Sequence, residues 1–109
     1  MNEFSQSRRL LKKTDYDYVF HQAKKVVSPH FIFLYRDNAI GHARLGMALS
    51  KKVIAKAHDR SRLKRLIRET FRINHRLPVV DVIVLARSGV AKAQNSELIA
   101  GLQHIWSTL

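Results

Sequence analysis

The sequence predicts a single α+β domain whose elements follow one another in the order α-β-β-α-β-α. Three observations predict this fold class. Apolar residues recur at helical spacing in three segments, three other segments have the composition or alternation of β-strands, and a chain of 109 residues with 46% hydrophobic residues is suited to one modest core. We therefore expect one domain over residues 1–109, in which residues 1–9, polar and without periodicity, form a loose basic lead-in.

The first helix is expected at about residues 14–24. Its apolar side chains are three or four residues apart and share one face: Tyr16, Val19, Phe20 and Ala23. Thr14 is the expected N-cap, because its hydroxyl is suited to accept from a free backbone amide of the first turn and Asp17 stands three residues later, as in a capping box. Ser28 and Pro29 then break the helical pattern.

Two strands are expected next. Residues 31–35 are rich in aromatic and β-branched residues, residues 44–50 alternate in polarity, and a polar turn with Gly41 separates them. This pattern predicts an antiparallel hairpin. One side of the second strand carries only small residues: Gly46, Ala48 and Ser50. This side is too small to bury much surface by itself.

The second helix is expected at about residues 57–75 and has two opposite faces. At 100° per residue, the apolar residues fall on one side: Leu63, Leu66, Ile67, Thr70 and Ile73. Polar and basic residues fall within about 100° on the other side: Ser61, Lys64, Arg65, Arg68, Arg72 and His75. We call this second set the cationic ridge.

The last elements are a strand and a helix. Residues 79–86, which follow Pro78, are almost wholly apolar, as in a central strand covered on both faces. Asn95 or Ser96 is the expected cap of a last helix, whose apolar stripe consists of Leu98, Leu102, Ile105 and Leu109. The strand, helix and strand of residues 44–86 form a parallel crossover, which general statistics make right-handed.

The positive charge is concentrated around the second helix. The chain has 20 Lys and Arg against 8 Asp and Glu, a net charge of +12. Residues 51–76 hold ten basic and two acidic side chains, and therefore +8 of this excess. Solvated helix faces normally mix the two signs, whereas only Glu69 compensates here. This pattern favours binding of a polyanion over a solvated face, a membrane surface or an acidic protein.

Enzymatic equipment is not visible in the sequence. There is no Cys, the six His residues have no metal-ligand or triad spacing, and no Gly-rich phosphate loop precedes a helix. Asp15 and Asp17 are two residues apart on a helix and do not share a face. We therefore expect no catalytic residue, no metal site and no organic cofactor in the protein. No signal-peptide pattern and no run of about 18 apolar residues is present, which predicts a cytoplasmic protein that does not bind membranes.

The first helix and the strand of residues 44–50 define a second candidate site. Tyr16 and Phe20 are four residues apart, and such pairs are more often part of a core than of a ligand platform. A sheet face of small residues beside aromatic rings is also suited to an extended single strand, because unpaired bases stack on such rings. Both interpretations stay open on the sequence alone.

Several segments resemble the protein subunit of bacterial ribonuclease P. The resemblance covers roughly residues 8–108 and is carried by Arg8-Arg9-Leu10, Phe20, residues 44–52 and, above all, the segment AHDRSRLKRLIRE at residues 57–69. The family signature is an Arg-Asn-Arg triplet that opens a helix, continues Ile-Lys-Arg and ends Arg-Glu. Arg60 and Arg62 match this triplet, whereas Ser61 stands where the family usually has Asn.

The resemblance implies a fold like the second domain of ribosomal protein S5, with a left-handed crossover. It also implies an endonuclease that removes the 5′ leader from precursor tRNA, in which the ribonuclease P RNA catalyses the hydrolysis and binds most of the Mg²⁺. The expected partners are that RNA and precursor tRNA, with no obligate protein partner. The alternatives are a ribosomal or other structured-RNA binding protein outside any enzyme, and a protein nuclease.

The resemblance also implies two sets of site residues. Those expected to contact the catalytic RNA are Lys51, Lys52, Arg60, Ser61, Arg62, Lys64, Arg65, Arg68 and Arg72. Those expected to line a groove for the single-stranded leader are Tyr16, Phe20, Leu34 and Ala48.

Overall fold

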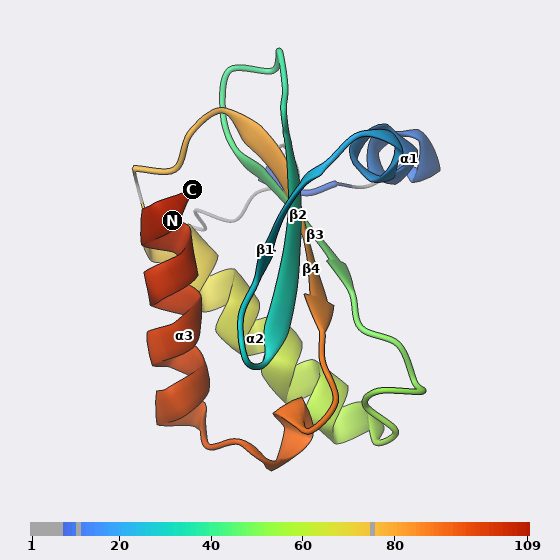
Figure 1. Cartoon of the computed structure of the whole chain (residues 1–109), viewed down its shortest axis with the longest axis vertical. Helices are drawn as coiled ribbons and strands as arrows, with labels where there is room; N and C mark the ends of the chain where they lie inside the picture. Colours follow the sequence, from blue (N-terminus) through green and yellow to red (C-terminus); the bar gives the residue numbers. More distant parts are fainter. Residues whose placement is uncertain (1–7, 11, 75) are drawn as a thin grey trace.

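The computed structural model describes residues 8–10, 12–74 and 76–109. Figure 1 shows a sheet with one helix on one side and two on the other. The helices are α1 (Lys13–His21), α2 (Ala57–Ile73) and α3 (Asn95–Thr108), with a short 3-10 helix η2 (Val90–Lys92) before α3. The strands are β1 (Lys24–Val27), β2 (Phe31–Asp37), β3 (Arg44–Ala48) and β4 (Val80–Ala86). The predicted α+β class is confirmed, with one strand more than expected.

The four strands lie in the order β1-β2-β4-β3. β2 is antiparallel to both β1 and β4, whereas β3 is parallel to β4. The predicted hairpin of residues 31–35 and 44–50 is therefore wrong, because β4 lies between these strands. β4 is the most apolar strand and gains most from a central position, where both its faces are covered. The predicted parallel crossover through α2 is confirmed, and its handedness stays a prediction.

The first helix ends earlier than expected. α1 stops at His21, and residues 24–27 form the edge strand β1, which the sequence pattern had missed. The segment Lys-Lys-Val-Val is too short to show a period, and lysines are well tolerated on an edge strand, where they face water. The true hairpin of this sheet joins β1 to β2 through Ser28, Pro29 and His30.

Both predicted helix caps are wrong. The N-cap of α1 is Lys12, whose backbone N–H donates to Oδ2 of Asp15 at 3.4 Å, so Thr14 and Asp17 do not form the capping box. The N-cap of α3 is Gln94, not Asn95 or Ser96. Asn95 is not free to cap, because its side-chain oxygen accepts from Arg62.

The larger core fills the space between the sheet and the helices α2 and α3. Trp106 is its centre, with ring centroids 5.0 Å from Phe33 and 5.5 Å from Phe71, and its Nε1 donates to Oγ1 of Thr70 at 2.9 Å. The apolar face of α2 differs in two positions from the prediction. Phe71 is buried, whereas Ile73 is 51% exposed because the helix ends there.

The smaller core lies under α1, on the opposite face of the sheet. Its buried members are Leu10, Val19 and Ile83. Residues 1–7 of the predicted loose lead-in lie outside the described residues. Arg9 already forms a parallel bridge with Leu45, and the N–H of Leu10 donates to the Leu45 carbonyl at 2.9 Å, so the chain joins the free edge of β3 from Arg9 onward.

Candidate nucleic-acid interface

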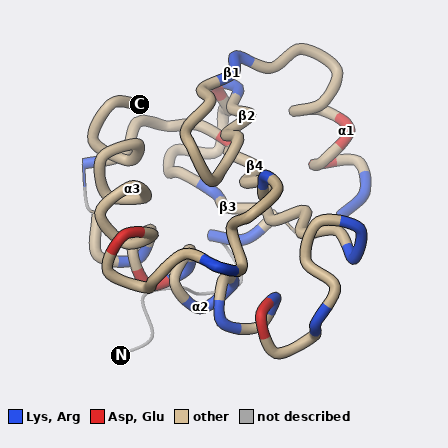
Figure 2. The backbone as a smooth tube through the Cα atoms, turned by 60° about the horizontal axis from the view of Figure 1, so that its bottom comes forward, with Lys and Arg blue, Asp and Glu red and all other residues tan. Residues whose placement is uncertain are grey.

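The cationic ridge forms on the face of α2 that points away from the core. Ser61 and Arg65 are exposed, and Lys64, Arg68 and Arg72 are half-buried beside them, while His75 lies outside the described residues. Figure 2 shows Lys and Arg recurring along α2 and the chain before it, whereas α3 is almost free of them. Arg72 is partly neutralised by Glu69, whose Oε2 lies 2.6 Å from Nη2 of Arg72. The positive surface therefore centres on Lys64, Arg65 and Arg68.

A polar cavity lies at the edge of this ridge, between α2, β3 and the amino-terminal segment. Its volume is about 220 Å³, and its cationic lining consists of Arg9, Lys64 and Arg68. Nε of Arg68 is buried and has no hydrogen-bond partner within the described part of the chain. A buried N–H without an acceptor is costly, so the site is suited to an anion that supplies oxygen atoms. Arg9 is not among the contact residues predicted from the sequence, where its only signal is the basic pair Arg8-Arg9.

Arg60 and Arg62 point away from the ridge and have partners inside the protein. Nη1 of Arg60 donates to the carbonyl oxygens of Ile54 at 2.8 Å and Ala55 at 3.1 Å. The guanidinium of Arg62 donates to two carbonyl oxygens and to the Asn95 side chain. The structure thus groups Lys64, Arg65 and Arg68 on one surface and separates these two arginines from it.

Lys51 and Lys52 lie in the connection between β3 and α2 and are exposed. The connection turns sharply there, because the N–H groups of Val53 and Ile54 both donate to the carbonyl oxygen of Ser50. These lysines therefore stand at the end of β3, next to the sheet and not on the ridge.

α1 covers only part of its face of the sheet, and the predicted groove lies on this face. Tyr16, Leu34 and Ala48 all pack against the small core of Leu10, Val19 and Ile83. The Tyr16 ring covers Gly46, and its hydroxyl oxygen accepts from the N–H of Met47 at 3.3 Å. Three of the four predicted groove residues therefore come together, with Tyr16 held in place by β3.

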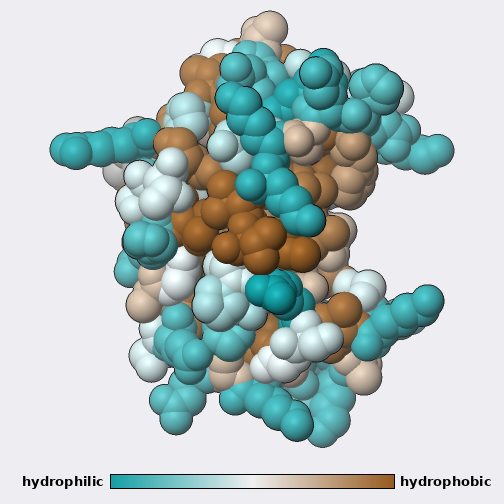
Figure 3. Space-filling view, in the orientation of Figure 1, coloured by the Kyte–Doolittle hydropathy of each residue, from teal (hydrophilic) through white to brown (hydrophobic). Residues whose placement is uncertain are grey.

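Phe20, the fourth predicted groove residue, is 47% exposed and is not part of that core. Its ring is therefore available to a ligand. The structure adds Leu85 to this face, since it also packs on the small core and pairs in register with Ala48. The sequence could not assign Leu85, because every residue of β4 looks buried until its neighbours are known. Figure 3 shows hydrophobic side chains exposed over the strands, with hydrophilic ones on either side.

A buried ion pair supports the sheet beneath α1. Arg44 of β3 binds Asp81 of β4, and Asp15 of α1 lies 3.6 Å from the same guanidinium. The hydrogen bond to Asp81 raises the pKa of Arg44, against the opposing effect of burial. Asp81 also accepts from Nδ2 of Asn38 at 2.7 Å. These acidic groups neutralise Arg44, so this part of the structure does not extend the positive surface.

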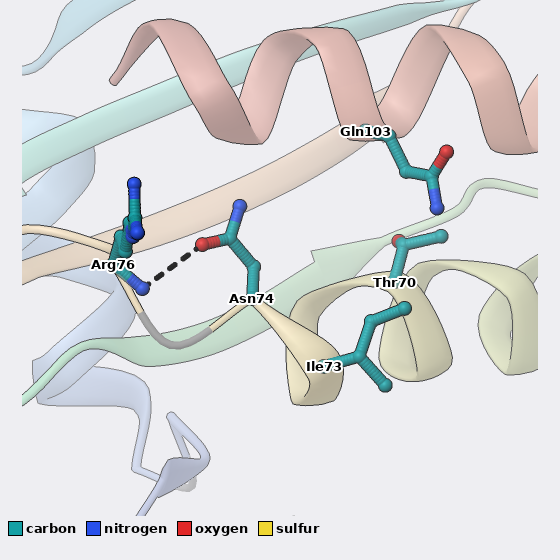
Figure 4. A pocket seen from close by; sticks show the side chains of 5 residues that line it. All are labelled: Thr70, Ile73, Asn74, Arg76 and Gln103. Carbon is teal, nitrogen blue, oxygen red and sulfur yellow. Dashed lines mark hydrogen bonds between the residues drawn. The ribbon is translucent and has the colours of Figure 1, made fainter.

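A further hollow of about 330 Å³ lies where α2 ends beside α3 (Figure 4). The exposed Ile73 lines it, together with Thr70, Asn74, Arg76 and Gln103. The side chain of Asn74 accepts from the N–H of Arg76 at 3.1 Å. Among the described residues of this lining, Arg76 is the only charged one, so they make the hollow less basic than the cavity beside Arg68.

Neither a membrane-spanning helix nor a metal-binding cluster is found among the described residues. No helix among residues 8–10, 12–74 and 76–109 has the length and apolar composition needed to cross a membrane. Within the same residues, no group of three or more His, Cys, Asp and Glu side chains is arranged to hold a metal ion.

Comparison with known proteins identifies relatives along nearly the whole chain. A family model described as Ribonuclease P matches residues 4–109. The ribonuclease P protein component of Legionella pneumophila strain Corby is 55% identical over 109 residues, covering 100% of this chain and 95% of the relative. That of Pseudoalteromonas atlantica is 44% identical over 110 residues, covering 99% of this chain and 91% of the relative.

Solved structures agree with these relatives. The ribonuclease P protein of Staphylococcus aureus superimposes with a TM-score of 0.85 at 28% identity, over 93% of this chain and 94% of that one. The protein from Thermotoga maritima gives a TM-score of 0.82 at 27% identity, over 93% and 96%. The family model, the relatives and the solved structures agree, and this chain belongs to the ribonuclease P protein component family.

Proposed function

We propose that this chain, as the protein subunit of ribonuclease P, binds the RNA subunit through the cationic ridge and the 5′ leader of precursor tRNA through the groove beside α1. The RNA subunit then carries out the hydrolysis that gives the mature 5′ end. We further propose that this holoenzyme acts in the cytoplasm. The observation that carries the proposal is the buried Nε of Arg68, which lacks a partner among the described residues and belongs to a side chain that lines a cavity with Arg9 and Lys64.

A phosphate of the RNA subunit fits that cavity chemically. Its oxygen atoms would accept from Nε of Arg68 and be neutralised by Lys64 and Arg9, all of which line the same space. Arg65 projects from the adjacent exposed face and would contact a neighbouring phosphate. This arrangement supports the assignment of the ridge to a folded RNA, whose closely spaced phosphates match closely spaced cations.

The groove has the properties that a single-stranded leader requires. Its floor is apolar, with Ala48, Leu85 and Leu34 on neighbouring strands. Phe20 at one side is exposed for stacking, and Lys51 and Lys52 follow the end of β3. Stacking with backbone contacts to lysine gives affinity with little sequence preference.

Two polyanions have to approach each other in this reaction, so the protein lowers their repulsion by placing cations between them. We assign the Mg²⁺ ions to the RNA subunit, where they would supply a metal-assisted hydrolysis. Asp81, Asp15 and Glu69 are poorly suited to hold them, because each lies beside an arginine.

Reconstitution tests the proposal. The protein should stimulate cleavage of precursor tRNA when added to its cognate RNA subunit at low Mg²⁺ concentration, because it replaces part of the cation requirement. The protein freed of RNA should not cleave the substrate. An absence of stimulation at every protein-to-RNA ratio would contradict the proposal, and cleavage by the protein alone would indicate a protein nuclease. Recovery of a different structured RNA with the purified protein would support the alternative of an RNA-binding protein outside this enzyme.

A further inference from the structure

Arg60 and Arg62 flank Ser61 at the amino end of α2, in the segment that carries most of the family resemblance. They do not lie on the ridge. At 100° per residue, Arg62 is about 160° from Lys64, about 120° from Arg68 and about 60° from Arg65, on the side toward α3. Arg60 lies near the buried side of the first turn. Both side chains donate hydrogen bonds to acceptors within the protein.

Arg60 holds the connection between β3 and α2. Its Nη1 donates to the carbonyl oxygens of Ile54 and Ala55, which precede the helix. Ile54 is completely buried, so these two bonds fix the connection against the core. The same connection carries Lys51 and Lys52. Arg60 thereby fixes the path of the chain that presents these two lysines at the end of β3.

Arg62 holds the connection between β4 and α3. Its Nη2 donates to the Ala91 carbonyl at 2.9 Å, and its Nη1 donates to the Ala93 carbonyl at 3.3 Å and to Oδ1 of Asn95 at 2.5 Å. One planar guanidinium thus binds three acceptors along five residues. A lysine ammonium has the same charge but is a single compact donor group, so it cannot span these acceptors.

The two connections leave the sheet at the same end, because β3 and β4 are parallel. Arg87 stands directly after β4 and is tied to the β1–β2 turn by its bond from Nη1 to the Ser28 carbonyl at 2.8 Å. Lys51 and Lys52 follow β3, and Lys92 lies in the segment that Arg62 holds. The positions of Lys51, Lys52 and Lys92 therefore depend on the hydrogen bonds of Arg60 and Arg62.

We propose that Arg60 and Arg62 are positioning residues, which set the two cation-bearing connections at the end of the leader groove and do not themselves pair with phosphate. The inference rests on the proposed function of the groove. It assigns to these arginines a task different from that of Arg65 and Arg68, although all four lie on one helix and carry the same charge.

Arg62→Lys tests the proposal, because it keeps the positive charge and removes the planar guanidinium that donates to three acceptors. In the holoenzyme, the affinity for precursor tRNA relative to mature tRNA should fall by about tenfold, the effect of losing one or two charge-assisted hydrogen bonds. The salt dependence of binding to the RNA subunit should be unchanged. In the free protein, amide hydrogen exchange at residues 90–93 should be faster. Arg76→Lys, at an exposed position outside the ridge and the groove, is the matched control and should leave all three measurements unchanged.

Asn95→Ala gives an independent test without any change of charge. It removes one acceptor of Arg62 at an exposed position, so it should reduce the preference for precursor tRNA in the same direction as Arg62→Lys. If Arg62 instead bound RNA, Asn95→Ala would release it and leave binding unchanged or tighter. Either of these results would overturn the proposal.

Other outcomes also decide the question. If Arg62→Ala lowers the salt slope as Arg65→Ala does, and exchange at residues 90–93 is unchanged, Arg62 contacts phosphate directly. If precursor and mature tRNA lose affinity equally, Arg62 is only structural. Both results contradict the inference. Failure of the proposed function is distinguishable, because Arg65→Ala would then have no effect on RNA binding, whereas the exchange measurement on the free protein still reports on Arg62.

Discussion

The guanidinium of Arg44 binds both carboxylate oxygens of Asp81, with Nε 2.9 Å from Oδ1 and Nη2 2.7 Å from Oδ2. The two residues face each other in register on the parallel strands β3 and β4. Asp81 is 1% exposed, and the side chain of Arg44 is 16% exposed. A central strand thus contains a carboxylate because a neighbouring strand supplies a forked donor, with Asn38 as a third donor.

Removal of this carboxylate should destabilise the fold. Asp81→Ala leaves Arg44 largely buried without its main partner, which is expected to reduce the free energy of unfolding by about 3–5 kcal/mol. Urea unfolding followed by circular dichroism measures the change. Glu69→Ala is the control, since that acid pairs with Arg72 near the surface and its loss should cost less than about 1 kcal/mol. Equal effects of the two substitutions would show that burial of the pair is unimportant.

The contribution of Arg44 should not depend on pH near neutrality. Its pKa is raised in the folded state, so the stability it provides is fully present below its unfolded pKa and is lost only as the pH rises through the folded pKa. The difference in unfolding free energy between the natural protein and Arg44→Gln should therefore be constant from about pH 6 to about pH 9. A marked decrease of this difference within that range would contradict the assignment.

Gly46 is required by the ring of Tyr16. A Cβ at position 46 would lie 2.9 Å from Cε2 and Cζ of Tyr16 and 2.9 Å from Cδ1 of Leu10. Gly46→Ala should displace the ring, break the bond from Met47 to the Tyr16 hydroxyl and destabilise the protein by about 1–3 kcal/mol.

Gly101→Ala provides the matched control for this substitution. A Cβ there has no atom within 4 Å, and the residue lies inside α3. It should stabilise the protein by about 0.5–1 kcal/mol, because alanine favours the helix. Thermal melts of both variants give the comparison, and a neutral Gly46→Ala would mean that Tyr16 is not held over β3 as described.

Arg68 is expected to make one contact with a phosphate of the RNA subunit. Arg68→Ala is expected to weaken binding of the RNA subunit and to lower the slope of log K against log salt by about 0.7–0.9. Filter binding across a salt series measures it. Arg36→Ala is the control, because Arg36 stacks on Tyr18 at 3.7 Å and donates to the Tyr18 carbonyl, on the other face of the sheet. An unchanged slope for Arg68→Ala would remove this residue from the interface.

Phe20 is expected to contact the leader of precursor tRNA and no part of mature tRNA. Phe20→Ala is expected to lower holoenzyme affinity for precursor tRNA by about 1–3 kcal/mol, the value of one stacked base, with no change for mature tRNA. Tyr18 is a suitable control on the same helix, because its hydroxyl donates to the Asp37 carbonyl and its ring carries Arg36, which leaves it engaged within the protein. Equal losses for both tRNAs would place the leader elsewhere.

The sequence predicted the structure well where the pattern lay within a single helix. The period of α2 identified its length, its buried residues Leu63 and Ile67 and the opposite ridge around Arg65, since both faces follow from one repeat. The prediction failed where local signals compete. The edge strand β1 looked like the end of a helix, and Thr14 looked like a cap that Lys12 and Asp15 form instead.

By itself, the sequence determined the fold class, the family resemblance, the basic helix and the segments that form its core, because these depend on composition and on periods within single elements. Only the tertiary structure decided that β4 lies between β2 and β3, that Tyr16 covers Gly46, and that Arg60 and Arg62 turn inward. These features depend on contacts between residues far apart in the chain. The sequence does not show where a charged side chain points, because its hydrogen-bond acceptors come from other parts of the fold. For this reason, some arginines of one helix face solvent and others bind the protein.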